Sequence, residues 1–92
     1  MKSKQPNQEL IDNLFITIGK NVQAKRKEKN ISQLELTHQM GFKSVSLVSQ
    51  AEIYYNKQHF SIKHLYIIAS ILECRLEDFF EGVEVKKNIE WV

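Results

Sequence analysis

The side chains best suited to specific hydrogen bonding are concentrated between residues 44 and 52. If this segment is helical, a repeat of 3.6 residues places Leu47, Val48 and Ala51 on one inward side. The opposite side then carries Ser46, Ser49 and Ile53, flanked by Val45 and Gln50. Glutamine can bond an adenine edge bidentately, serine can bond several bases, and valine can contact a thymine methyl group. For a helix considered alone, an ordinary polar outer face is the simpler interpretation.

The residue types that serve in catalysis and metal binding do not form a recognisable site. His38, His59 and His64 have no spacing that brings them together on one helix face. Cys74 is the only cysteine and has no neighbouring base, so a small core residue is the favoured interpretation. The sequence contains no nucleophile elbow and no glycine-rich phosphate loop. We therefore expect no enzymatic activity, no metal, no cofactor and no small-molecule ligand.

Length and composition indicate one small domain. The chain has 92 residues, of which 42% are hydrophobic and 26% are charged. A single cysteine cannot form an internal disulfide, which fits a reducing compartment. The first residues are polar rather than signal-like, and no apolar run is long enough for a membrane helix. We expect a cytoplasmic protein without a membrane partner.

The net charge is only +2, but the charges are unevenly distributed. Basic residues crowd positions 20–29, and acidic residues crowd positions 73–84. This asymmetry is compatible with one face that meets phosphate and another that stays in water. Two solvated helix faces remain the simpler explanation.

Apolar periodicity and capping residues predict a series of helices separated by short turns. The expected N-caps are Asn7, Ser32, Ser44 and Ser61, and Glu35 completes a capping box with Ser32. We expect helices that end near residues 29, 40, 53 and 72, followed by a short fifth helix over residues 76–80. Asn30 suits a left-handed helix end.

Two regions outside these helices carry further apolar residues. In the polar and aromatic loop 54–60, packing over the core is favoured over a platform for stacked bases. In the tail, Val83, Val85, Ile89 and Trp91 could share one face of an extended strand.

The second and third predicted helices are too short to be stable alone, and a turn containing Gly41 joins them. Two short helices in this arrangement form a helix-turn-helix, which presents its second helix to a DNA groove. Residues 18–80 resemble, in order, the lambda-repressor and Cro type of helix-turn-helix family, also called the XRE family. The matching segments are Ile18-Gly19-Lys20-Asn21-Val22 with Arg26, Ile31-Ser32-Gln33 with Leu36, Ser44 to Glu52, Ser61 to Leu72, and Leu76 to Phe80. The Ser-Val-Ser opening of the third helix is similar to that of restriction-modification controller proteins.

The resemblance implies an all-α fold, a five-helix lambda-repressor-like helix-turn-helix domain with an extended first helix and a short C-terminal tail. We expect residues 1–7 to be disordered, residues 8–82 to form the DNA-binding domain, and residues 83–92 to form a tail that could serve in dimerisation. The residues expected at DNA are Gln33, Lys43, Ser44, Val45, Ser46, Ser49, Gln50, Asn56 and Lys57. Arg26 and Glu52 match positions at which the family commonly forms an internal ion pair. The sequence departs from the family at Thr37, where alanine is usual, and in a longer loop after Glu52.

The function implied by the resemblance is a sequence-specific transcription regulator that binds double-stranded DNA as a homodimer. Surplus apolar residues in the first helix and the tail also favour a homodimer. We expect its interface on the fifth helix and the tail, centred on Phe79, Val85 and Trp91, with the N-terminal extension as an alternative. A protein-interaction module that keeps the fold without binding DNA is the competing hypothesis, because residues 45–53 contain no Lys or Arg.

Overall fold

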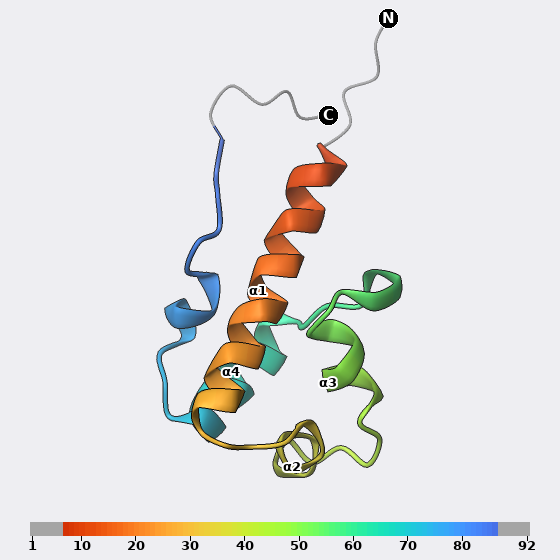
Figure 1. The fold of residues 1–92 in the computed structure, drawn as a ribbon, viewed down its shortest axis with the longest axis vertical. Helices are drawn as coiled ribbons and strands as arrows, with labels where there is room; N and C mark the ends of the chain where they lie inside the picture. Colours follow the sequence, from red (N-terminus) through yellow and green to blue (C-terminus); the bar gives the residue numbers. More distant parts are fainter. Residues whose placement is uncertain (1–6, 87–92) are drawn as a thin grey trace, which may run out of the picture.

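The computed structural model describes residues 7–86, and their regular structure is entirely helical (Figure 1). Four α-helices and two 3-10 turns follow one another along the chain: α1 (Gln8–Glu28), α2 (Gln33–Gln39), α3 (Ser46–Ala51), η1 (Tyr55–Lys57), α4 (Ile62–Leu72) and η2 (Leu76–Phe80). No helix within the described part is long and apolar enough to cross a membrane. Residues 83–86 have no regular structure, and the rest of the expected strand, with Ile89 and Trp91, lies outside the described residues.

The ends of three helices are set by the polar residues that the sequence singles out. The Asn7 side chain accepts from the Glu9 and Leu10 amides, and the Ser32 and Ser61 side chains cap α2 and α4. These predicted caps are confirmed. The predicted capping box at α2 is only half formed, because the Glu35 carboxylate accepts a hydrogen bond from Gln39 instead of from the Ser32 amide.

Two elements differ from the sequence prediction. The third helix is shorter than the predicted one, since it runs only from Ser46 to Ala51. The predicted fifth α-helix is a 3-10 turn of five residues, from Leu76 to Phe80. Five residues offer almost no i to i+4 hydrogen bonds, and the Asp78 carboxylate fixes the tighter turn by accepting from the Arg75 amide.

The core lies where α1, α3, α4 and η2 meet. The buried apolar side chains include Val22 of α1, Val48 of α3, Ile68 of α4 and Phe79 of η2. The Asn21 side-chain amide donates to the backbone oxygens of Phe79 and Glu81, at 2.8 Å each, and so ties η2 to α1. Figure 1 shows α1 between η2 on one side and α3 on the other, with its N-terminal half extending beyond the other helices. The long helix therefore serves as the frame that positions α3.

Candidate nucleic-acid interface

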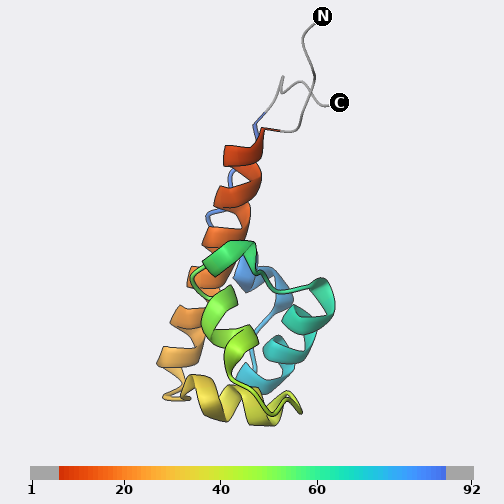
Figure 2. The ribbon, with the colours of Figure 1, turned by 90° about the vertical axis from the view of Figure 1, so that its right-hand side faces the viewer.

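The outer face of α3 is the first component of the candidate site. Val48 and Ala51 are buried and Leu47 is half-buried, so the inward side of the helix is the one that the sequence predicts. In Figure 2, α3 and η1 lie on the same side of the molecule, in front of α1. The side of α3 that carries Ser46, Ser49 and Gln50 therefore faces away from the core.

The N-terminal end of α3 is organised by hydroxyl groups. The Ser44 side-chain oxygen accepts from the Ser46 amide at 3.1 Å, and the Ser44 and Ser46 hydroxyls bond to each other at 2.8 Å. Val45 already has helical backbone angles, which makes Ser44 the functional N-cap although regular helix begins later. Lys43, Ser44 and Ser46 are exposed, so this end offers one cation and two hydroxyls to a ligand.

Further along α3, the outer face becomes less polar. Ser49 and Gln50 are half-buried, and the Ser49 hydroxyl donates to the Ser46 carbonyl oxygen at 3.2 Å. Ile53, one turn beyond Ser49 on the same face, is 65% exposed. An isoleucine this exposed costs free energy in water, so the face combines hydrogen-bonding groups with an aliphatic contact surface.

A buried ion pair joins three helices behind this face. Arg26 Nε donates to Glu52 Oε2 at 2.7 Å, and Arg26 Nη2 donates to Glu52 Oε1 at 3.0 Å. Arg26 Nη1 also donates to the Ile31 carbonyl oxygen. The Gln33 side-chain amide donates to Glu52 Oε1 at 2.8 Å, which brings the start of α2 into the same network. A bidentate pair fixes relative orientation as well as distance, so this network sets how α2 and α3 sit on α1.

Gly19 allows α1 and α3 to approach each other closely. A Cβ atom at this position would lie 2.6 Å from the backbone oxygens of Ala51 and Glu52. Backbone atoms cannot move aside as a flexible side chain can. The absence of a side chain at Gly19 is therefore a requirement of the observed placement of α3.

The loop after α3 is held by an aspartate that the sequence reasoning did not single out. Tyr54, Asn56 and Lys57 all have left-handed backbone angles, with φ of 57°, 55° and 63°. The Tyr54 hydroxyl donates to Asp12 Oδ1 at 2.7 Å, and Lys57 Nζ lies 3.0 Å from the same oxygen. No local sequence signal links residue 12 to a loop more than forty positions later, so only the fold brings them together.

Hydrogen bonding shifts the ionisation of this cluster. Donation by Gln8, Tyr54 and Lys57, in that order of effect, lowers the pKa of Asp12 to about 2. The hydrogen bond from the Tyr54 hydroxyl to Asp12 raises the pKa of Tyr54, because loss of the hydroxyl proton would break this bond to the carboxylate. Asp12 is therefore a carboxylate at any physiological pH. Lys57, expected at DNA, is paired with it, whereas Asn56 is exposed at the tip of the loop.

The aromatic residues of the loop divide into two groups. Tyr54 and His59 stack on Phe15 of α1, with ring centroids 5.9 Å and 3.9 Å away, and Phe60 is buried. Packing over the core, the favoured prediction, is confirmed for Tyr54 and Phe60. Tyr55 instead is exposed.

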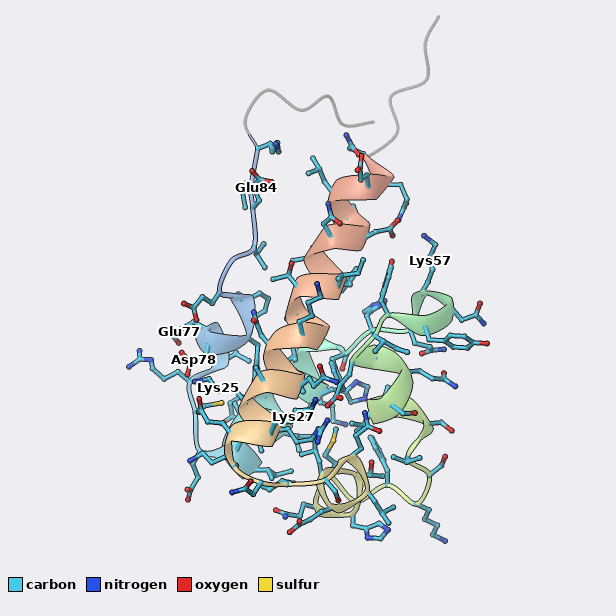
Figure 3. The ribbon with its side chains drawn as sticks, in the orientation of Figure 1. Lys25, Lys27, Lys57, Glu77, Asp78 and Glu84 are labelled. Carbon is cyan, nitrogen blue, oxygen red and sulfur yellow. The ribbon has the colours of Figure 1, made fainter. Side chains whose placement is uncertain are left out.

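The charged clusters are not separated in space as the sequence pattern allowed. Lys25 Nζ lies 3.8 Å from Glu28 and 4.0 Å from Asp78 of the acidic C-terminal stretch. Figure 3 shows Lys25 next to Asp78 and Glu77, on the side opposite Lys57. Lys25 therefore does not belong to a basic face separate from the acidic residues, and α1 distributes the lysines of residues 20–29 around its circumference.

The residues expected at a dimer interface, Phe79, Val85 and Trp91, differ in their exposure to solvent or lie outside the described part of the chain. Phe79 is 0% exposed because it packs in the core of its own chain, so its expected place in an interface is corrected. Val85 is 88% exposed. Trp91 lies outside the described residues. An apolar cavity of about 330 Å³ lies between α1, α4 and η2, and the residues that line it include Leu14, Phe15, Ile62 and Phe80.

No family model and no curated protein matches the chain by sequence. Solved structures with the same fold include an HTH_3 family transcriptional regulator from Vibrio cholerae, with a TM-score of 0.65 and 25% identity over 75% of this chain and 37% of that one. The restriction-modification controller protein C.AhdI from Aeromonas hydrophila gives a TM-score of 0.64 and 21% identity, over 72% of this chain and 96% of that one. A structure of the SinR/SinI protein complex gives a TM-score of 0.62 and 26% identity, over 71% of this chain and 61% of that one.

These comparisons establish the fold of helix-turn-helix transcription regulators for this chain. The chain spans only about a third of the length of the Vibrio cholerae regulator. The Vibrio cholerae protein is described as a transcriptional regulator, and C.AhdI is described as a restriction-modification controller protein.

Proposed function

We propose that the protein is a transcription regulator that binds double-stranded DNA sequence-specifically with α3 in the major groove. The observation that carries the proposal is the outer face of α3, where Ser46, Ser49 and Gln50 lie on the side opposite the buried Val48 and Ala51, on a helix that follows α2 in a helix-turn-helix. A major groove admits an α-helix and displays a distinct hydrogen-bonding pattern for each base pair. Val45 and Ile53 add aliphatic groups that suit thymine methyl groups.

Phosphate contacts in this proposal come from residues on either side of α3. Gln33 lies at the start of α2, and its side chain is oriented by its bond to Glu52. Lys43 precedes α3, while Asn56 and Lys57 follow it, and all three are exposed. Contacts of this kind fix the register of a protein on the duplex, whereas the side chains of α3 choose among sequences.

We further propose that the regulator binds its operator as a homodimer. The short α3 carries no Lys or Arg, so one copy has few groups with which to gain affinity. Two copies related by a two-fold axis would place two recognition helices about 34 Å apart, on one face of the duplex. The exposed Val85 and the protruding N-terminal half of α1 are the surfaces left for this contact once Phe79 is assigned to the core.

A salt titration on random duplex DNA tests this function. Each phosphate neutralised by a basic side chain contributes roughly −0.9 to the slope of log affinity against log salt. We expect measurable binding at low salt and a slope of about −2 to −4 per protomer, from the few cations near α3. Absence of any duplex binding at low salt would remove the proposal.

A protein-interaction module is the second candidate, and one observation favours it. Ile53 and Tyr55, two residues that follow α3, are both exposed, and a partner protein could cover them. One structural neighbour is itself a complex of two proteins. This candidate predicts binding that does not depend on DNA and is only weakly sensitive to salt.

A further inference from the structure

Asp12 is an ionised residue that makes none of the proposed DNA contacts, although it is paired with Lys57, which does. Its carboxylate accepts hydrogen bonds from Gln8 at 2.9 Å, from Tyr54 at 2.7 Å and from Lys57 at 3.0 and 3.3 Å. The Asp12 side chain is 26% exposed, and that of Lys57 is 64% exposed. The Asp12 carboxylate is thus partly shielded from solvent, whereas the Lys57 ammonium group remains accessible to a ligand.

Lys57 lies on the side of the molecule that α3 would present to a groove. The loop Tyr54–Lys57 directly follows α3 and lies on the same side of the molecule (Figures 1 and 2). Figure 3 shows Lys57 at the outer end of this loop, away from the acidic residues Glu77, Asp78 and Glu84. Lys57 Nζ also lies 5.7 Å from the centre of the Tyr54 ring, so its position is restricted by two neighbours.

An ammonium group shared between a carboxylate and a phosphate gains less from DNA than a free one. Any contact of Lys57 with a phosphate either breaks its bonds to Asp12 or brings the Asp12 charge close to the DNA backbone. Both routes reduce the favourable charge interaction, and neither adds a net released counterion.

We propose that Asp12 lowers the affinity of the protein for DNA by holding Lys57 in an ion pair that a phosphate must compete with. This inference rests on the proposed DNA-binding function and assigns to the N-terminal half of α1 a role in setting affinity. Because a contact between Lys57 and a phosphate does not depend on base sequence, the Asp12–Lys57 ion pair weakens binding to every duplex. Selection of a site then depends more strongly on α3.

The alternative role of Asp12 is purely structural, as an anchor for a loop with three left-handed residues. The two roles predict opposite signs. Loss of an anchor loosens the loop and weakens DNA binding, whereas loss of a competing charge strengthens it.

Asp12→Asn separates these roles, because asparagine keeps the shape and an acceptor for the Tyr54 hydroxyl but removes the charge. We expect this variant to bind random duplex about two- to fivefold more tightly per protomer at low salt, the size typical of an exposed ion pair. The salt slope should steepen by about one unit at most, because Lys57 then acts as an additional free cation. Circular dichroism and thermal unfolding would verify that the variant keeps its fold.

Two matched variants make the result specific. Glu77→Gln changes the net charge equally, but Glu77 pairs with Arg75 on the side opposite Lys57, and we expect little effect on DNA affinity. In a Lys57→Met background, Asp12→Asn should lose its gain, because methionine has no charge to release. In the free protein, Lys57→Met should also raise the pKa of Asp12, which carboxyl NMR titration measures directly.

Tighter binding by Asp12→Asn that vanishes in the Lys57→Met background supports the proposal. Equal or weaker binding by Asp12→Asn overturns it, as does a gain that persists without Lys57 or that Glu77→Gln reproduces. If neither the wild type nor Asp12→Asn binds any duplex at low salt, the proposed function itself fails, and this inference fails with it.

Discussion

Gln50 is the side chain on α3 with the greatest capacity to distinguish bases, since its amide donates and accepts through two separate atoms and can bond an adenine edge bidentately. It lies half-buried on the flank of the outer face, so neighbouring residues restrict its rotamers before DNA arrives. We predict that Gln50→Ala weakens specific binding by about 1–3 kcal/mol and relaxes the preference at one base pair. Binding-site selection with the variant measures both effects. Gln39→Ala, an exposed glutamine of α2, is the matched control, and unchanged selectivity in Gln50→Ala would contradict the assignment.

Arg26 and Glu52 act at the residue scale by joining helices. Glu52 is 1% exposed and accepts from Arg26 and Gln33, so removal of Arg26 leaves a buried carboxylate without its cation. We predict that Arg26→Met lowers the free energy of unfolding by about 3–5 kcal/mol, and that Arg26→Met with Glu52→Leu recovers much of the loss. Urea unfolding measures both. Arg75→Met removes an exposed pair and should leave the midpoint unchanged, so equal losses at Arg26 and Arg75 would argue against the network.

At the scale of elements, the close approach of α1 and α3 determines where the recognition face lies. Alanine is favoured over glycine inside a helix by about 1 kcal/mol, so Gly19→Ala would stabilise α1 if space allowed. A Cβ atom 2.6 Å from two backbone oxygens of α3 does not allow it. We predict a net loss of about 1–3 kcal/mol in the free energy of unfolding, together with weaker DNA binding, because α3 must move outward. Lys20→Ala, at the next and exposed position, is the control, and a more stable Gly19→Ala variant would contradict the account.

The elements also show which parts of the structure are readable from the sequence. Residues 8–28 and 62–72 have long apolar repeats and strong caps, so periodicity alone predicts α1 and α4. The inward side of α3 is equally clear, because Leu47, Val48 and Ala51 fall on one side of a helical repeat. The 3-10 form of residues 76–80 could not be predicted, since five residues are too few for their apolar spacing to distinguish a 3-10 helix from an α-helix. The loop Tyr54–Lys57 was also beyond prediction, because its left-handed residues are held by Asp12 and Phe15 of a distant helix.

The same contrast applies to the candidate site. Ser44, Ser46, Ser49 and Gln50 could be placed on an outer face from spacing alone, whereas the partner of Lys57 could not be foreseen. Phe79 illustrates the reverse error. The family resemblance favoured a place for its side chain at a dimer contact of the fifth helix, but Asn21 ties η2 to α1 and Phe79 is buried in the core of its own chain.

At the scale of the whole molecule, the distribution of exposed apolar groups bears on assembly. Val85 is exposed and belongs to the segment 83–86, which runs alongside the protruding half of α1 (Figure 1), whereas Tyr66 is an exposed aromatic residue on α4. We predict a homodimer at micromolar concentration by sedimentation equilibrium. Val85→Lys should shift the protein toward monomer and weaken operator binding, because a lysine there would face its symmetry-related copy across the interface.

Tyr66→Lys tests whether the position matters, since it places the same charge on another exposed apolar site. It should leave the dimer intact. A monomeric wild type would contradict the predicted homodimer. A dimer disrupted by Tyr66→Lys and not by Val85→Lys would move the interface away from the C-terminal segment.

The central claim is that α3 reads DNA sequence from a two-fold assembly, and selection of binding sites from a pool of random duplexes tests it most directly. The account predicts enrichment of one two-fold-symmetric site, whose half-sites lie one helical turn, about 34 Å, apart. The preference should weaken at a base pair in each half-site when Gln50 is replaced by alanine. Recovery of unselected sequences, at a salt concentration where the protein still binds the pool, would contradict it.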